Sequence, residues 1–150
     1  QSLIQQHKPE NYVKERDYLF TAQRLFEFVT REIKYVPNEL NINFWLKPNE
    51  IIINKVSDDE DLAVLGCTLL YALGDEHATV YLMELEDLHT HAVVLTKVNG
   101  MTLLLDPCTG HNFFKYYGEK AHVFKRYQFN GQKIKRALYR FNAQVYEQFI

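Results

Sequence analysis

The chain has 150 residues, the size of one ordinary domain, and 47% of them are hydrophobic, which is enough for a sizeable core. Its formal net charge of −2 argues against a general nucleic-acid binder, and no apolar run reaches the roughly 18–20 residues of a membrane helix. The two cysteines, Cys67 and Cys108, are too few for a disulfide framework, so a reducing compartment is expected.

The ends of the chain predict that it is one domain of a longer protein. It begins at Gln1 rather than methionine and stops at the apolar pair Phe149-Ile150. No internal repeat or low-complexity stretch divides it. We therefore expect residues 1–150 to form a single domain.

The first half of the chain predicts two helices. Residues 10–34 carry apolar side chains at steps of three and four, as in an amphipathic helix, and Pro37 ends it. A loop or short strand with the only tryptophan, Trp45, follows, and Pro48 could begin a short helix. Residues 59–73 are apolar almost all round, which predicts a buried helix that begins with acidic residues and ends at Gly74.

The second half predicts an antiparallel sheet. Residues 77–85 alternate, and residues 91–98 and 101–107 flank Asn99-Gly100, the strongest short hairpin signal. Residues 122–129 read as a further strand, whereas the last twenty residues fit either a helix or a strand. The expected fold class is α+β, with a buried central helix packed on an antiparallel sheet.

Three residues of this arrangement could share a site: Asp59 at a helix start, His91 at a strand start, and Asp106 at a strand end. With a two-residue turn at 99–100, positions that sum to about 199 face each other, so His91 lies opposite Cys108 or its neighbour. A histidine held by a carboxylate beside a helix N-terminus is the general form of an acyl-transfer site.

Several segments resemble the transglutaminase-like (papain-like cysteine hydrolase) superfamily. These segments are Trp45, Pro48, Ser57-Asp58-Asp59-Glu60-Asp61-Leu62-Ala63, Ala72-Leu73-Gly74, His91-Ala92-Val93 and Asp106-Pro107. The resemblance implies that superfamily's fold, with a catalytic cysteine at position 59, a histidine at 91 and an aspartate at 106. Position 59 is instead an aspartate.

The segment DPCTGHNFF, residues 106–114, is similar to the transglutaminase-like domains of ciliary basal-body and transition-zone scaffolds, especially the coiled-coil and C2-domain-containing family. Those domains are regarded as catalytically inactive. The resemblance therefore implies a cytoplasmic protein of the cilium, basal body or centrosome whose partners are other ciliary or centriolar proteins. No oligomeric state follows from the sequence.

These observations predict a pseudoenzyme that serves as a scaffold or interaction module. A carboxylate is favoured at a helix N-terminus by about 0.3–1 kcal/mol, but it attacks an amide poorly because the product is a high-energy anhydride. Asp59, His91 and Asp106 would then be vestigial triad positions, next to a cleft formed by Trp45, Cys108 and His111. We expect no cofactor, no metal and no nucleic-acid partner.

Alternative chemistries stay open at this point. The chain could be an acyl transferase or peptidase with Cys108 as a non-standard nucleophile, or a carboxylate hydrolase using Asp59. Cys67 lies eight residues past Asp59, roughly 12 Å along the helix, and is expected to be a core thiol. Asp59, His91 and Asp106 could also hold a metal, for which the His89–His91 pair is weak support.

The C-terminal third is rich in basic residues, with aromatic residues between them. The basic residues are Lys125, Arg126, Lys133, Lys135, Arg136 and Arg140. An RNA or anionic-lipid surface is possible on this pattern, and a solvated face or a docking surface for an acidic protein is favoured.

Overall fold

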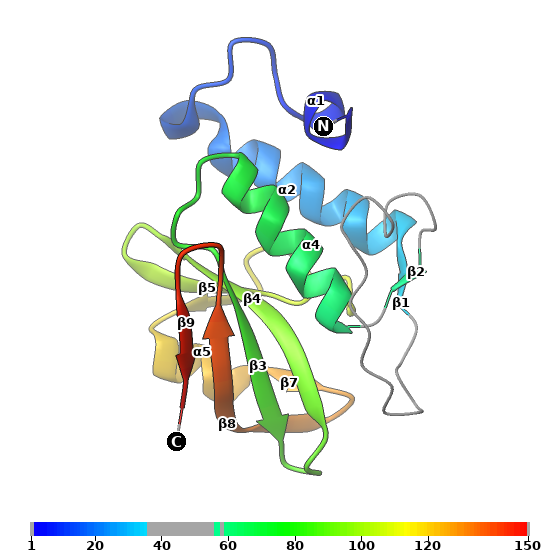
Figure 1. Ribbon diagram of the computed structural model, residues 1–150, viewed down its shortest axis with the longest axis vertical. Coiled ribbons are helices and arrows are strands. Elements are labelled where there is room, and N and C mark those ends of the chain that lie inside the picture. The colour runs from blue at the N-terminus through cyan, green and yellow to red at the C-terminus, as the bar shows by residue number, and fades with distance from the viewer. Residues whose placement is uncertain (1, 36–55, 58, 150) are drawn as a thin grey trace.

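Helices α2 and α4 lie side by side and cover one face of an antiparallel sheet (Figure 1). The computed structural model describes residues 2–35, 56–57 and 59–149. In chain order the elements are α1 (Ser2–His7), α2 (Lys14–Glu32), β1 (Lys34–Tyr35), β2 (Val56–Ser57), α4 (Asp59–Ala72), β3 (Thr79–Leu85), β4 (Thr90–Val98), β5 (Met101–Leu105), β6 (Tyr116–Gly118), α5 (Lys120–Arg126), β7 (Gln128–Phe129), β8 (Gln132–Phe141) and β9 (Tyr146–Gln148). The predicted α+β class is confirmed.

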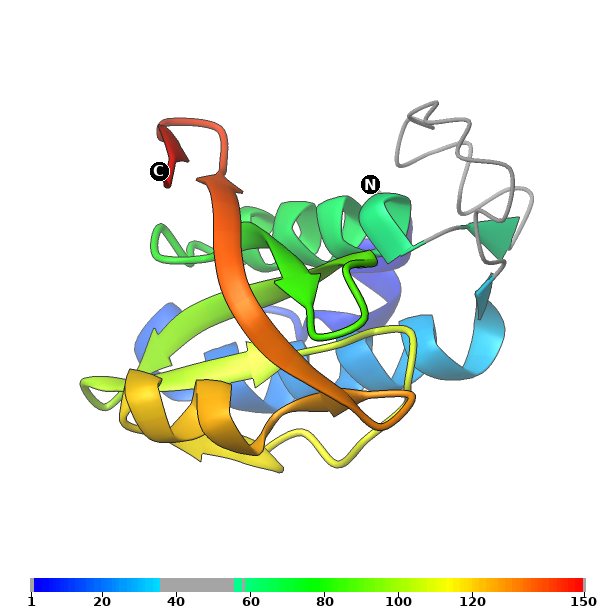
Figure 2. The same cartoon turned by 90° about the horizontal axis from the view of Figure 1, so that it is seen from below.

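The main sheet has the strand order β6-β5-β4-β3-β8-β7, and β9 pairs with β8. Both faces are covered, as the view from below shows: α2 and α4 lie on one side and α5 on the other (Figure 2). Strand β4 therefore buries residues on both faces. Ala92 and Val94 join the core beneath α2 and α4, whereas Val93 and Leu95 join a second core with Val123 of α5.

The β4–β5 hairpin forms in the predicted register. Asn99 and Gly100 have φ of 53° and 79°, the positive values that a type I′ turn requires. Val94 pairs with Leu105, so facing positions sum to 199 as expected. This register brings the beginning of β4 next to the segment that follows β5.

In the C-terminal third, one element differs from the sequence prediction, and another settles a segment for which the sequence left helix and strand open. The segment around residues 120–126 is helix α5 rather than a strand. The reason is tertiary: Val123 and Tyr127, four residues apart, are both fully buried against the sheet, which is a helical period. The ambiguous last segment forms strands β8 and β9, because β8 fills the open edge of β3.

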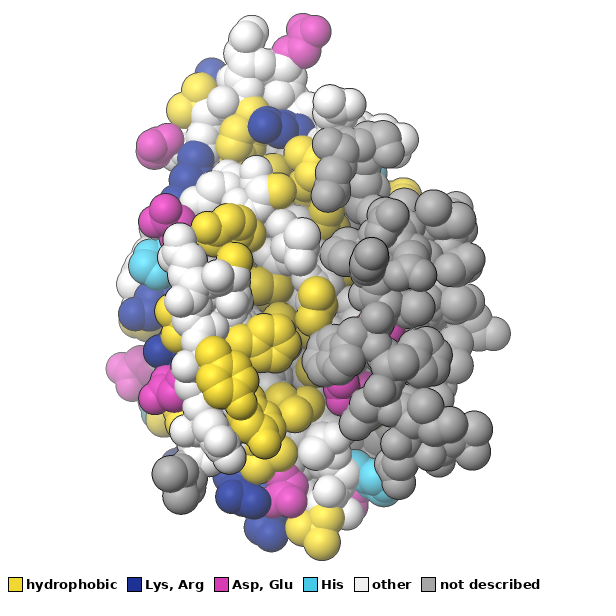
Figure 3. Space-filling view, in the orientation of Figure 1, with side chains coloured by type: hydrophobic (Ala, Val, Ile, Leu, Met, Phe, Trp, Pro, Cys, Tyr) yellow, Lys and Arg dark blue, Asp and Glu magenta, His cyan; other side chains and the backbone are white. Residues whose placement is uncertain are grey.

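The face beside the β8–β9 hairpin is rich in hydrophobic side chains, which gather in a band over β3, β8 and β9 (Figure 3). Tyr146 is 69% exposed and packs on Tyr139, with ring centroids 6.0 Å apart. None of the helices in the described part of the chain has the length and apolarity needed to cross a membrane.

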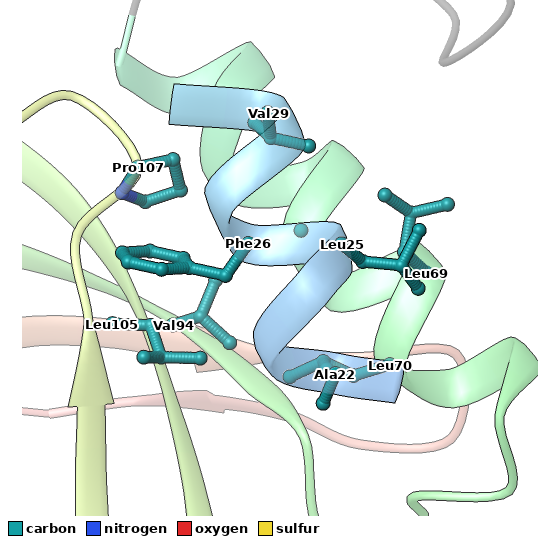
Figure 4. Close-up of a pocket in the computed structure, with 10 residues that line it drawn as sticks. Ala22, Leu25, Phe26, Val29, Leu69, Leu70, Val94, Leu105 and Pro107 are labelled. Atoms are coloured by element: carbon teal, nitrogen blue, oxygen red, sulfur yellow. The ribbon is translucent and has the colours of Figure 1, made fainter. Parts of the chain in front are cut away.

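A small apolar cavity of about 20 Å³ lies between α2, α4 and the sheet (Figure 4). Gly66 of α4 lines it, and a methyl group there would meet Val94 at 3.4 Å and Pro107 at 3.7 Å, which are ordinary contacts. Gly66→Ala should therefore raise the free energy of unfolding by about 1 kcal/mol, because alanine favours the helix and fills space. Urea denaturation would measure this gain, and a loss of stability would show that the site cannot accept the methyl group.

Candidate functional site

Three elements meet at the beginning of α4. Asp59 is the first residue of α4, His91 is the second residue of β4, and Asp106 directly follows β5. The packing of α4 on β4 and the hairpin register bring the three together. The expected neighbourhood of these residues is therefore present, although they are 47 positions apart in sequence.

Asp59 binds the beginning of β4 through one oxygen. Its Oδ2 accepts a hydrogen bond from the backbone N–H of Ala92 at 2.9 Å and lies 3.2 Å from Nδ1 of His91. The carboxylate is 13% exposed. Asp59 thus fixes one ring nitrogen of the histidine from the helix side.

Asp106 holds the other ring nitrogen of His91. Its Oδ2 lies 3.0 Å from Nε2 of His91 and accepts a hydrogen bond from the hydroxyl of Tyr127 at 2.5 Å. Its Oδ1 accepts the backbone N–H of Cys108 at 3.0 Å. Since the Asp106 side chain is 0% exposed, these contacts replace water around a fully buried carboxylate.

Two carboxylates on one imidazole set its charge. Burial lowers the pKa of His91, but the hydrogen bonds and negative charges of Asp106 and Asp59 outweigh it and raise the pKa to about 9. Burial likewise raises the pKa of Asp106, and His91, Tyr127 and the Cys108 N–H together lower it below its usual range. At neutral pH the site is therefore an imidazolium between two carboxylates.

Aromatic rings enclose His91. Phe129 stacks on the imidazole with centroids 3.8 Å apart, and Tyr127 lies nearly parallel at 6.4 Å. The His91 side chain is 1% exposed as a result. The sequence analysis missed both aromatic residues, although the turn signal at Asn130-Gly131 places Phe129 at a hairpin that folds back on the sheet.

Cys108 belongs to this cluster. Its sulfur, a ring nitrogen of His91 and a carboxylate oxygen of Asp106 all lie within 4.8 Å of one another. The residue is half-buried, so its side chain is the more accessible member of the group. The predicted sum of 199 holds for the strand pairs from Val98–Met101 to Val94–Leu105, and Cys108 follows the last of these pairs by three residues.

A model of the transglutaminase-like domain matches residues 7–136. The chain belongs to this family. A search of curated protein sequences found no match.

Solved structures with the same fold include LapG of Legionella pneumophila, in several states. One LapG structure has a TM-score of 0.68 and 18% identity, covering 98% of this chain and 74% of LapG. The calcium-bound form of LapG has a TM-score of 0.68 and 19% identity, covering 98% of this chain and 74% of LapG. A candidate cysteine protease from Cytophaga hutchinsonii has a TM-score of 0.51 and 15% identity, covering 78% of this chain and 35% of the protease chain. The transglutaminase-like fold is therefore confirmed.

These findings correct the prediction of a catalytically inactive pseudoenzyme. The fold is shared with LapG and with a candidate cysteine protease, and that prediction is wrong. The prediction rested on the aspartate at position 59. Position 59 holds no thiol, but the fold places the thiol of Cys108 within 4.8 Å of His91.

The other cysteine of the transglutaminase-like domain has a different environment. Cys67 is buried in α4, 6% exposed, and packs in the core beneath the sheet. Burial, with a smaller contribution from the charge of Asp75, raises the pKa of its thiol to about 12. It is a buried core thiol, as expected, and it offers an internal control for Cys108.

His111 stabilises the turn after β5 instead of joining the site. Its Nε2 accepts the backbone N–H of Asp106 at 2.9 Å, and its Nδ1 lies 2.7 Å from the carbonyl oxygen of Asn112. This pattern requires a neutral ring with the proton on Nδ1. Burial lowers the pKa of His111 accordingly. The ring thereby orients the backbone that carries Asp106 and Cys108.

The remaining predicted residues lie elsewhere. Trp45, Pro48 and Asp58 are outside the described residues. His89 is 82% exposed and pairs with Asp87 at 2.9 Å, so the His89–His91 pair does not share a site. Of the basic third, Arg136 pairs with Glu84 at 3.0 Å and Arg140 with Glu147 at 2.5 Å, which fits a solvated surface.

An apolar groove begins beside Asp59. One part, a hollow of about 190 Å³, is lined by Glu60, Val80, Leu82, Ala92, Tyr139, Phe141 and Tyr146. It continues past Val80 and Phe141 into a second hollow of about 310 Å³ between α4 and β8. The groove coincides with the hydrophobic band of Figure 3 and gives the transglutaminase-like domain a long apolar surface that leads to the N-terminus of α4.

Proposed function

We propose that the domain is a cysteine-type hydrolase or acyl transferase that acts on peptide or amide bonds, with Cys108 as the attacking group. One observation carries the proposal: the Cys108 sulfur lies within 4.8 Å of both His91 and the Asp106 carboxylate. A thiol, an imidazole and an orienting carboxylate are the parts of a nucleophilic acyl-transfer site. The shared fold with a candidate cysteine protease supports the same class.

The chemistry assigns a role to each group. The Cys108 thiolate attacks the carbonyl carbon to form a thioester, and the His91 imidazolium gives its proton to the departing amine. The neutral imidazole then takes a proton from the water, or the second amine, that cleaves the thioester and frees the thiolate. Asp106 is the positioning residue that holds Nε2 of His91 at 3.0 Å. The proton that is exchanged is the one on Nδ1, which the partly exposed Asp59 contacts at 3.2 Å.

The groove beside Asp59 supports an extended substrate with apolar side chains. It is lined by Leu82, Phe141 and Tyr146 among others and adjoins Ala92, the neighbour of His91. A peptide in this groove would lie along Ala92 of β4, the strand that also carries His91. We assign this groove to the substrate on that basis.

The first test compares the two thiols of the same protein. With iodoacetamide at pH 7 in the presence of EDTA, Cys108 should be modified at least about tenfold faster in the native protein than in a His91→Gln variant, because an adjacent imidazolium favours the thiolate. Cys67 should stay unmodified until urea unfolds the chain. Peptide mass spectrometry would give both rates.

Equal rates for Cys108 in the native protein and in His91→Gln would contradict the proposal. A peptide library supplies the matching activity test, in which cleavage or acyl transfer should vanish in Cys108→Ser. Retention of turnover in that variant would move the attacking group elsewhere. Cys67→Ala is the matched control: it removes the other thiol, and turnover should persist, at a rate that reflects only the change in the second hollow of the groove.

A second candidate function, partner binding within a ciliary or centriolar protein, is favoured by the segment Asp106–Phe114 alone. This second proposal concerns the location of the protein in the cell, and partner binding there is compatible with acyl transfer at Cys108. A tagged full-length protein that accumulated at basal bodies would support this setting. A diffuse distribution would contradict it.

A further inference from the structure

We propose that His91, Asp106 and Cys108 form a binding site for a divalent transition-metal ion of the zinc type. One donor atom from each residue lies within 4.8 Å of the other two. In a tetrahedral zinc site, with bonds of about 2.0–2.3 Å, donor atoms are separated by roughly 3.3–3.6 Å. The cluster is therefore near the size that one ion would close. Nε2 of His91 and Oδ2 of Asp106 share a hydrogen bond of 3.0 Å, so an ion would take the place of that proton and move the two atoms apart by a few tenths of an ångström.

The residues around the three donors match the support that metal ligands need. A ligating histidine ordinarily donates its second N–H to a carboxylate, and Asp59 lies 3.2 Å from Nδ1 of His91. This contact leaves Nε2 as the nitrogen that faces Asp106. The hydroxyl of Tyr127 and the N–H of Cys108 hold the Asp106 carboxylate in place. The ligands are thus oriented before any ion arrives.

The donor set selects the class of metal. A thiolate sulfur, an imidazole nitrogen and one carboxylate oxygen suit zinc or cobalt, whereas calcium and magnesium require mostly oxygen ligands. Within residues 2–35, 56–57 and 59–149, this is the group of at least three histidine, cysteine or acidic side chains whose ligand atoms all lie within 4.8 Å of one another. Three protein ligands would leave the fourth position of the ion for water or for a ligand entering beside the half-buried Cys108.

The inference goes beyond the proposed function and has a physical consequence for it. A sulfur bound to an ion cannot also attack a carbonyl carbon, so metal binding and acyl transfer exclude each other. Zinc would then act as an inhibitor of the proposed enzyme. The metal site does not depend on the proposed function, because it is argued from the distances among the three donor atoms.

Cobalt titration of the full chain tests the site without any activity readout. The expected result is a thiolate-to-cobalt charge-transfer band at one equivalent of Co²⁺, which Zn²⁺ bleaches and Ca²⁺ leaves unchanged. Cys108→Ser should remove the band, and Cys67→Ala, which changes the core thiol, should retain it. Circular dichroism would verify that each variant is folded.

Two results would overturn the proposal: no band in the native protein, or a band that persists in Cys108→Ser. His91→Gln adds a second criterion, since it should weaken cobalt binding at least about tenfold. Iodoacetamide labelling in EDTA separates the two proposals. Fast labelling without a cobalt band refutes the metal site alone, and a cobalt band with slow labelling refutes the proposed nucleophile alone.

Discussion

Asp106→Asn should lower the free energy of unfolding by about 3–5 kcal/mol at pH 7, because it removes the fully buried one of the two carboxylates that hold a buried cation. Asp106 is 0% exposed and contacts Nε2 of His91 at 3.0 Å. The asparagine keeps the shape of the side chain and one acceptor oxygen. It removes the negative charge that faces the His91 imidazolium and that accepts the hydrogen bond of the Tyr127 hydroxyl. Urea unfolding of both proteins, followed by circular dichroism, would measure the difference.

The chain provides a matched control for this substitution. Asp87 makes the same kind of contact with His89, at 2.9 Å, on the surface of the molecule. Water solvates that pair, so Asp87→Asn should leave the unfolding midpoint unchanged. Equal effects of the two substitutions would show that the buried pair has no special role in stability.

The stability of the domain should fall by about 3 kcal/mol as the pH rises from about 6.5 to about 9. His91 has its pKa raised from 6.5 to about 9 by its two carboxylates, against the opposing effect of burial. A raised pKa means that the folded protein binds the proton more tightly than the unfolded chain does. The contribution is therefore complete below pH 6.5 and is lost as the pH passes about 9, at about 1.4 kcal/mol for each pKa unit.

His91→Gln should flatten this part of the profile. Urea unfolding at several pH values between 6 and 9.5, with EDTA present, would give the comparison. The lowered pKa of His111 acts in a separate window, since its contribution is present above pH 6.5 and is lost as the pH falls. A native profile that is flat from pH 6.5 to 9 would contradict the assignment of the charge to His91. The imidazole resonances of His91 in a pH titration by NMR would verify it directly.

Local sequence determined much of the frame. The acidic start and apolar body of α4 identified a buried helix, and Asn99-Gly100 determined the register of β4 and β5 because both residues tolerate positive φ. From that register alone, His91 and Asp106 are neighbours. The fold class and the neighbourhood of the site could be predicted for this reason, since each depends on periodicity or on a short-range turn. The family was predicted from the resemblance of short motifs around Asp59, His91 and Asp106.

The tertiary structure decided what surrounds the histidine. The segment that holds Tyr127 fits a strand by composition, yet it follows helix α5 because Val123 and Tyr127 pack together against the far face of the sheet. Tyr127 and Phe129 then enclose His91. The sulfur of Cys108 lies within 4.8 Å of a ring nitrogen of the same histidine. Sequence patterns could not show this, because burial and charge at one atom depend on every element packed around it. Which side chains surround His91 therefore depends on the tertiary structure and not on the residue type at position 59.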